Sequence, residues 1–261
     1  MNWSLGDNDR VFLSGYFGRD VNKFGSMFQV DYGNATGTFR WNHVFNGSLF
    51  SNFTLIYSDF NYTLGVPQGS QGFKWKSNII DYSIRNDYTW YLNPNNTVVF
   101  GFQSIYHTIK PGVSQSLGES FISDIKIPDA HAIESGVFIS NDQNITPRLG
   151  VSYGLRFSLF QNIGKGTLYN FDKEYEVSDT TFYESGEIYK TYQGLEPRLS
   201  IRYALNDKTS IKSSYNRMYQ YMHLASNSTA TFPLDMWFFK QSECSASIGR
   251  PGGFRYIPEF F

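Results

Sequence analysis

The sequence predicts an all-β fold, an antiparallel transmembrane β-barrel segment of about ten strands that is incomplete and stays an open curved sheet. Three observations predict it. The composition is rich in aromatic and poor in charged residues, apolar and polar residues alternate along many segments, and short and long connections between these segments take turns along the chain.

The composition is unusual for a water-exposed surface. Of 261 residues, 18% are aromatic and 17% are charged, against about 25% charged in an average soluble domain. Mean hydropathy is nevertheless −0.37, and no stretch approaches the ~18 consecutive apolar residues that a spanning helix needs. The net charge of −1 carries no signature of nucleic-acid binding. Strands with one face toward lipid and the other toward water fit these values.

Alternation with a period of two is clearest in residues 195–205, 148–160 and 210–221. In the first segment one face carries Leu195, Pro197, Leu199, Ile201, Tyr203 and Leu205, and the other carries Glu196, Arg198, Ser200, Arg202 and Ala204. In 210–221 the pattern assigns Tyr219 and Tyr221 to the apolar face. Weaker alternation predicts further strands at 1–5, 10–18, 35–45, 49–60, 79–91, 98–107 and 131–140.

The connections distinguish a barrel from a sandwich. Short connections rich in turn-forming residues lie at 6–9, 46–47, 93–96, 141–147 and 206–208. Longer polar stretches lie at 19–33, 63–72, 109–129, 161–191 and beyond residue 222. Strict alternation of the two kinds puts all tight turns at one end of an up-and-down sheet, as in bacterial outer-membrane barrels. Greek-key sandwiches seldom sort their connections in this way.

Two other classes of protein remain open at this point. A soluble β-sandwich that binds glycans would share the alternation, and its loop aromatics would form the binding platform. A small closed outer-membrane barrel, acting as a pore or an adhesin, would share the alternating connections.

Several stretches carry a family resemblance. They are Leu13 to Asp20 (LSGYFGRD), Asn141 to Arg156 with its TPRL and YGLR, Glu196 to Tyr203 (EPRLSIRY), and Leu205 to Arg217 followed by Tyr219 to Tyr221. Their order and spacing resemble the barrel of TonB-dependent receptors of the Bacteroidetes type over roughly residues 1–237.

This resemblance implies a receptor in the bacterial outer membrane that captures a scarce nutrient and imports it with energy from the inner-membrane TonB complex. The substrate classes it implies are siderophores, cobalamin, oligosaccharides and peptides. The implied partners are outer-membrane lipid, a plug domain, the TonB complex and a small nutrient ligand, with no nucleic acid.

The sequence also departs from that family. It shows no signal peptide, TonB box or plug domain, and about ten strands stand against the roughly 22 of such transporters. We therefore expect a truncated barrel that does not transport alone. We expect residues 1–222 to form the barrel segment and 223–261 an extracellular loop and an aberrant tail, whose likeness to the family ends after Trp237.

The predicted functional residues fall into two groups. Charged residues on the polar faces are expected to line the barrel lumen: Arg40, Asp81, Arg85, Asp87, Glu134, Arg148, Arg156, Glu196, Arg198, Arg202 and Lys212. Aromatic residues of the stretch 161–191 and its continuation are expected to stack on solute: Tyr169, Phe171, Tyr175, Phe182, Tyr183, Tyr189 and Tyr192.

No catalytic residue, cofactor site or metal site is predicted. The four histidines, His43, His107, His131 and His223, lack metal-binding spacing, and Cys244 is the only cysteine. Hydrolase and phosphate-binding motifs are absent from the sequence, so we expect a protein that is not an enzyme.

Overall fold

The computed structural model describes residues 1–25, 27–66, 72–117, 124–171, 177–225 and 236–239. Eleven strands form the main sheet. They are β1 (Asn2–Ser4), β2 (Asp9–Phe24), β3 (Phe28–Val44), β4 (Leu49–Val66), β5 (Phe73–Asn93), β6 (Asn96–Ser116), β7 (Ile125–Lys126), β8 (Ala130–Thr146), β9 (Leu149–Ile163), β12 (Ile188–Asn206) and β13 (Thr209–Asn216). Two further hairpins are not paired with it: β10 (Gly166–Phe171) with β11 (Val177–Tyr183), and β14 (Met222–Ala225) with β15 (Met236–Phe239).

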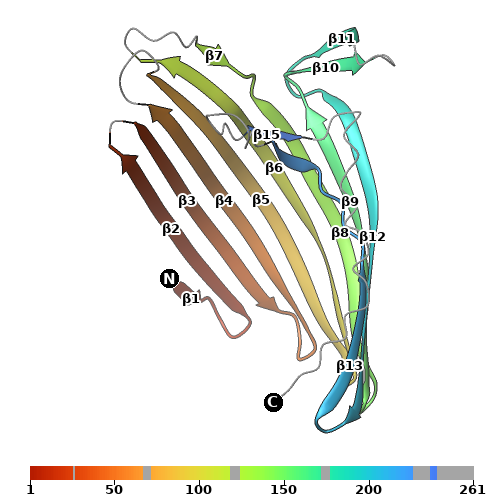
Figure 1. Ribbon diagram of the computed structural model, residues 1–261. Helices are drawn as coiled ribbons and strands as arrows, with labels where there is room; N and C mark the ends of the chain where they lie inside the picture. Colours follow the sequence, from red (N-terminus) through yellow and green to blue (C-terminus); the bar gives the residue numbers. More distant parts are fainter. Residues whose placement is uncertain (26, 67–71, 118–123, 172–176, 226–235, 240–261) are drawn as a thin grey trace.

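The main sheet is a single curved layer of antiparallel neighbours (Figure 1). Its order is β1-β2-β3-β4-β5-β6-β8-β9-β12-β13, with β7 paired to β6. The all-β prediction and the ten-strand antiparallel order are confirmed. The glycan-binding sandwich is wrong, because the strands form one layer and not two packed sheets. Among the described residues the end strands β1 and β13 do not pair with each other, so this sheet stays open.

The tight turns all lie at one end of the sheet, at the bottom of Figure 1, as predicted. Side chains fix several of them. The Asn46 amide oxygen accepts the backbone N–H groups of Ser48 and Leu49, at 2.9 and 3.0 Å, and the Asn206 amide oxygen accepts that of Lys208, at 2.9 Å. Such local bonds replace the ladder partners that the chain loses where it reverses.

The strands run farther than the alternation predicts. The expected loop at 19–33 is wrong, because β2 and β3 stay paired up to Phe24 opposite Phe28. At about 3.3 Å per residue, the 21 residues of β5 and of β6 exceed the ~30 Å of hydrocarbon they have to cross. Apolar and polar residues alternate only in the part of a strand where one face meets lipid and the other meets water. Backbone pairing between the strands continues beyond that part.

Strand β13 is the exception, since it is shorter than predicted. It ends at Asn216 rather than near residue 221, so the expected place of Tyr219 and Tyr221 on the apolar face is wrong. The chain then turns toward the concave side, where the hairpin of β14 and β15 lies (Figure 1). There Phe239 of β15 packs in one cluster with Ile109, Ala132 and Phe160 of the sheet.

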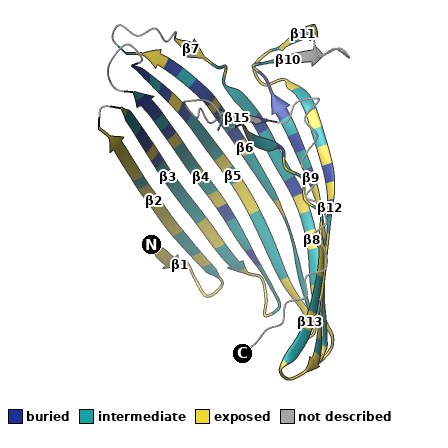
Figure 2. Cartoon of the chain, viewed as in Figure 1, coloured by how far each residue is buried: buried dark blue, intermediate teal, exposed yellow. Residues whose placement is uncertain are grey.

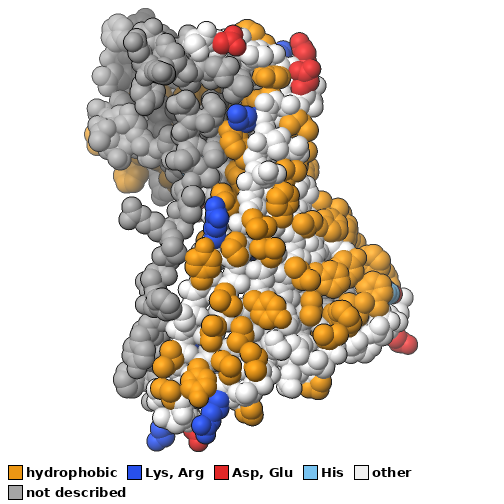
Figure 3. Space-filling model, turned by 90° about the vertical axis from the view of Figure 1, so that its right-hand side faces the viewer, with side chains coloured by type: hydrophobic (Ala, Val, Ile, Leu, Met, Phe, Trp, Pro, Cys, Tyr) orange, Lys and Arg blue, Asp and Glu red, His pale blue; other side chains and the backbone are white. Residues whose placement is uncertain are grey.

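The two faces of the sheet differ in chemistry. Register places Phe102, Val137, Phe157 and Leu195 in one row across β6, β8, β9 and β12, and these side chains are all exposed. Figure 3 shows hydrophobic side chains spread over this convex face, and Figure 2 shows exposed and buried residues alternating along the strands. An apolar face left open to solvent is the arrangement that lipid requires. Among the described residues, no helix is long and apolar enough to cross a membrane.

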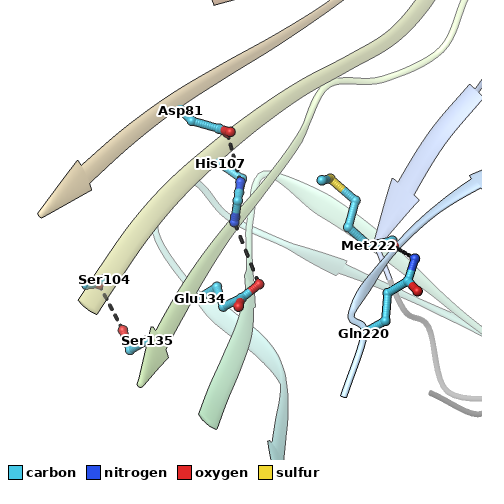
Figure 4. A network of polar contacts seen from close by, with 7 residues as sticks. All are labelled: Asp81, Ser104, His107, Glu134, Ser135, Gln220 and Met222. Atoms are coloured by element: carbon cyan, nitrogen blue, oxygen red, sulfur yellow. Dashed lines mark hydrogen bonds and ion pairs between the residues drawn. The ribbon is translucent and has the colours of Figure 1, made fainter. Parts of the chain in front are cut away.

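A polar pair on this lipid-facing side shows how hydroxyl groups are satisfied there. Ser104 of β6 and Ser135 of β8 are cross-strand partners, and their hydroxyl oxygens lie 2.9 Å apart (Figure 4). Each hydroxyl therefore finds in its neighbour the partner that lipid cannot supply.

A charge on the convex face should prevent stable insertion. Leu155 on β9 is exposed between apolar neighbours, so we expect Leu155→Arg to cost about 2 to 4 kcal/mol near the bilayer centre. The control is Thr36→Arg, which adds the same charge on the concave face in the row of Asp81. The readout is the folded fraction in carbonate-washed outer membranes, by heat-modifiable gel migration. Equal losses for both variants would contradict the assignment of the faces.

Candidate functional site: the concave wall

The concave wall carries a belt of charged side chains across five strands. Register aligns Asp81 of β5 with His107 of β6, and Arg156 of β9 with Glu196 of β12. Glu134 of β8 lies on the same face, two residues from the Ala132 that pairs with His107. Because cross-strand partners share a face, adjacent strands bring these groups together although they lie far apart in sequence.

His107 is at the centre of one half of the belt. Its Nδ1 lies 2.8 Å from the Asp81 carboxylate, and its Nε2 lies 4.0 Å from the Glu134 carboxylate (Figure 4). The imidazole side chain is 6% exposed, and Nε2 has no hydrogen-bond partner. One edge of the ring is thus held by Asp81, and the other points toward Glu134 without contacting it. The described residues contain no group of three or more side chains suited to hold a metal ion.

Glu196 is at the centre of the other half. Its carboxylate is 7% exposed and lies 4.0 Å from Arg156 and 3.7 Å from Arg198. Beside them, Arg85 donates two hydrogen bonds to Asp87, at 2.6 and 2.8 Å, and its guanidinium stands 5.9 Å from the centre of the Phe138 ring. Cations and anions alternate across the wall, so its charge is nearly balanced.

A hollow of about 510 Å³ opens at this half of the belt. Its lining includes three cations, Arg85, Arg156 and Arg198, together with Phe138 and several serines. Asp87 and Glu196 contact these guanidinium groups on one side, so N–H donors on the other side can bind a group in the hollow. The hollow can therefore accept a polar group that forms hydrogen bonds with guanidinium and hydroxyl donors.

The chain that leaves β13 covers part of the wall. The Tyr221 ring stacks on Phe160 with centroids 5.0 Å apart, and the Tyr221 and Ser158 hydroxyl oxygens lie 2.9 Å apart. The Arg217 backbone N–H donates to the Pro197 carbonyl at 3.1 Å, and the Arg217 guanidinium stands 4.9 Å from the Tyr219 ring. Apolar surface on the concave side is thus covered by the protein's own segment.

The structure brings some of the predicted lumen residues together and separates others. Seven form the belt and its border: Asp81, Arg85, Asp87, Glu134, Arg156, Glu196 and Arg198. Arg202 and Lys212 pair across β12 and β13 close to a tight turn, and Arg40 lies in the row of Arg85 on β3. Arg148 lies in the turn between β8 and β9, outside both strands.

The predicted loop aromatics are less fully described. Tyr183 and Tyr189 stack with centroids 5.1 Å apart, Phe182 is 77% exposed, and Lys190 stands 5.9 Å from the Tyr192 ring. Tyr169 and Phe171 belong to β10, but their side chains lie outside the described part, as does the whole of Tyr175. The expected loop at 161–191 is in part the hairpin of β10 and β11.

Sequence reasoning missed four residues of the wall: His107, Phe138, Ser158 and Tyr221. The spacing of His107 from the other histidines gives no support for a metal site, and the sequence offers no other role for it. Alternation along the strand could have placed His107, because Gln103, Ile105 and His107 point to the same face of β6. The register puts His107 opposite Asp81 on that face.

Comparison with known proteins identifies the class. The sequence matches the family described as outer membrane beta barrel domain over residues 112–252, more than half of the chain. The chain belongs to this family, and the protein is therefore one of the bacterial outer membrane. The match continues past residue 222, where the predicted barrel segment ends.

Solved structures similar in fold include transporters and receptors for copper, iron chelates and a hemophore. They include the copper transporter OprC (10% identity, TM-score 0.65, 84% of this chain and 36% of that chain). BauA, the ferric preacinetobactin receptor from Acinetobacter baumannii, shares 13% identity with a TM-score of 0.59 over 90% of this chain and 41% of that one. The Serratia marcescens hemophore receptor HasR shares 14%, with a TM-score of 0.62 over 84% and 34%.

At these identities the likeness shows the fold alone. The chain spans about a third to two fifths of the length of these structures. No curated protein matches the sequence.

The charged belt gives a first prediction for this wall. Removing the carboxylate in Glu196→Ala leaves the Arg156 and Arg198 guanidinium groups without their shared anion. We expect the free energy of unfolding to fall by about 2 kcal/mol. The loss is no larger because Arg198 is half exposed and solvent weakens its interaction with Glu196. Asp207→Ala in the exposed β12–β13 turn is the matched control. Thermal unfolding of the detergent-solubilised protein measures both. A Glu196 variant as stable as the control would show that the belt adds nothing to stability.

The covering segment gives a second prediction. We expect Tyr221→Ala to cost about 3 kcal/mol, because a buried ring and its stacking on Phe160 are lost. Tyr221→Phe removes only the hydroxyl group and should cost about 1 kcal/mol. Tyr215→Ala, on the lipid-facing side of β13, is the control for loss of an exposed ring. Tyr221→Ala and Tyr215→Ala with equal effects would argue against the folded-back segment.

Proposed function

We propose that this chain forms part of the barrel wall of a TonB-dependent receptor, of the Bacteroidetes type, that imports a scarce nutrient across the outer membrane. The observation that carries the proposal is the single-layer sheet with an apolar convex face and a charged concave face. The fold shared with receptors of this class supports it, as does the order of the sequence motifs quoted above.

The open sheet bears on how the chain works. Lipid offers no hydrogen bonds to an unpaired strand edge, and both β13 and the upper part of β2 present one. In this proposal, further strands complete the barrel and a plug domain fills it, so the 261 residues alone do not transport. The division into a barrel segment 1–222 and a tail 223–261 stays a prediction.

The concave wall then has a defined role. The charged belt, with Arg40, Arg148, Arg202 and Lys212 toward its borders, is proposed to hold the plug and to guide the solute. The polar hollow beside Arg85, Arg156 and Arg198 supports this role, because it offers donors to a passing polar group. The aromatic residues between 169 and 192 are proposed to capture solute outside the cell.

The class of solute is best tested first among metal chelates. The similar structures are a copper transporter, a ferric preacinetobactin receptor, and a receptor in complex with its hemophore and heme. These ligands belong to those proteins. For this protein they only decide which class of solute is tested first. Cobalamin, oligosaccharides and peptides are the further classes to test.

Uptake by the bacterium that carries the gene tests the proposal. We expect deletion of the gene to reduce TonB-dependent accumulation of at least one radiolabelled solute from the four classes. The gene with Arg156→Ala and Arg198→Ala should restore less uptake than the gene with Asp207→Ala. Accumulation of all four classes unchanged by deletion would refute the importer.

The 261-residue chain alone provides a separate arm. We expect it to restore no uptake and to form no stable conductance in planar bilayers. A steady conductance, together with heat-modifiable migration, would instead support the small closed pore.

A further inference from the structure

The tight turn between β3 and β4 contains Asn46 followed by Gly47. It is the only place in the sequence where an asparagine is followed directly by a glycine. The turn belongs to the end of the sheet that carries the tight turns (Figure 1), which in outer-membrane barrels faces the periplasm. Both residues are exposed, so water reaches the side-chain amide of Asn46 and the backbone after it.

Three hydrogen bonds hold the Asn46 side chain in one position. Its Oδ1 accepts the Ser48 backbone N–H at 2.9 Å, the Ser48 hydroxyl at 2.9 Å and the Leu49 backbone N–H at 3.0 Å. The ring that the first of these bonds closes contains both the Asn46 Cγ and the Gly47 nitrogen. The side-chain amide is therefore folded back over the peptide group that follows it.

The three donors are placed where a reaction at this amide develops charge. If the Gly47 nitrogen attacks Asn46 Cγ, the negative charge of the tetrahedral intermediate falls on Oδ1. Donors about 2.7 to 3.1 Å from such an oxygen stabilise it, and all three lie in that range. Each bond strengthens as its acceptor becomes charged. The turn thus supplies an oxyanion hole for the side chain of its own asparagine.

The attacking nitrogen is free and unhindered. Within the described part of the chain, no hydrogen bond engages the Gly47 N–H. Glycine has no Cβ beside its nitrogen, and a Cβ built at Gly47 would meet nothing within 4 Å. Solvent base can therefore remove the proton, and the nitrogen can approach Asn46 Cγ.

Two other tight turns share the placement of the amide but lack the other conditions. The Asn93 side-chain oxygen accepts two hydrogen bonds, at 3.0 and 2.9 Å, but the next residue is Pro94, whose nitrogen carries no hydrogen. The Asn206 oxygen accepts one, at 2.9 Å, and the side chain of Asp207 crowds the following nitrogen. Of these three turns, the one at Asn46 combines several donors with an accessible nucleophile.

We propose that Asn46 is a site of spontaneous deamidation, promoted by the turn between β3 and β4. The Gly47 nitrogen loses its proton to solvent base and bonds to Asn46 Cγ, the Cγ–Nδ2 bond breaks, and ammonia leaves. Water then opens the cyclic imide. Cleavage of the new Cγ–N bond gives aspartate, and cleavage of the original peptide C–N bond gives isoaspartate. One water is consumed and one ammonia is released, with no enzyme and no cofactor.

The turn also determines which product is favoured. The carboxylate of an aspartate at position 46 can accept the same three hydrogen bonds, with a charge that strengthens them. Isoaspartate lengthens the main chain and moves the carboxylate away from these donors. Folding therefore raises the share of aspartate. The product adds one negative charge at the periplasmic rim, and it accumulates with the age of the molecule, whatever solute the protein handles.

Peptide mapping by mass spectrometry tests this proposal on the full-length protein in its own outer membranes. We expect Asn46 to lose its amide roughly tenfold faster in the folded protein than in the same protein unfolded in guanidinium. Asn93 and Asn206 should keep theirs over the same time. The rate at Asn46 should rise with pH, because the peptide nitrogen attacks after losing its proton. Isoaspartyl methyltransferase distinguishes the two products.

Two variants separate the oxyanion hole from the nucleophile. Ser48→Ala removes one donor, and we expect it to slow the reaction about 5-fold in the folded protein and to change nothing in the unfolded one. Gly47→Ala crowds the nitrogen and should slow the reaction in both states. Ser4→Ala, at an exposed serine beside another tight turn, is the matched control and should react as the wild type does. Heat-modifiable migration shows that each variant is folded.

Several results would overturn the proposal. A folded protein that loses the Asn46 amide no faster than the unfolded one would show that the turn does not promote the reaction. Equal rates for Ser48→Ala and Ser4→Ala in the folded state would exclude the oxyanion hole. Equal loss at Asn206 would indicate only the exposure that turns share, and an isoaspartate share unchanged by folding would contradict the control of the product.

Discussion

The structure depends on one constraint, that every backbone N–H and C=O within hydrocarbon needs a partner from another strand. An antiparallel single-layer sheet meets this need strand by strand, and it does so without a conventional interior. The register that results decides which side chains are neighbours. His107 meets Asp81, and Arg156 meets Glu196, because the backbone ladder aligns their strands.

The same ladder determines how polar groups are distributed between the two faces. On the convex face, a hydroxyl group in lipid has only its cross-strand neighbour as a partner, which explains the pairing of Ser104 with Ser135. On the concave face, Glu196 is compensated both across strands, by Arg156 at 4.0 Å, and within its own strand, by Arg198 at 3.7 Å. A guanidinium group has five N–H donors, so these contacts leave donors available on Arg156 and Arg198.

The sequence predicted what depends on local alternation and missed what depends on tertiary pairing. Residues 195–205 and 148–160 could be assigned to strands and faces, because apolar residues alternate there with polar or small ones up to Leu159. The extension of β2 and β3 to Phe24 and Phe28 could not, since both faces are polar or mixed at that level. The fold-back of Tyr221 also escaped prediction, because its parity matched a continuing strand while its ring is buried against Phe160.

The concave wall is not uniformly polar, and this limits what the lumen can be. Ile109, Ala132 and Phe160 are buried there in one cluster with Tyr221 and Phe239, which come from the segment after β13. A barrel filled with water alone would expose this apolar surface beside the charged belt, at a cost in free energy that grows with the exposed area. The wall therefore requires a protein segment against it. Tyr221 and Phe239 of the same chain supply that segment, so the apolar part of the wall does not by itself distinguish a plugged receptor from a pore narrowed by its own chain.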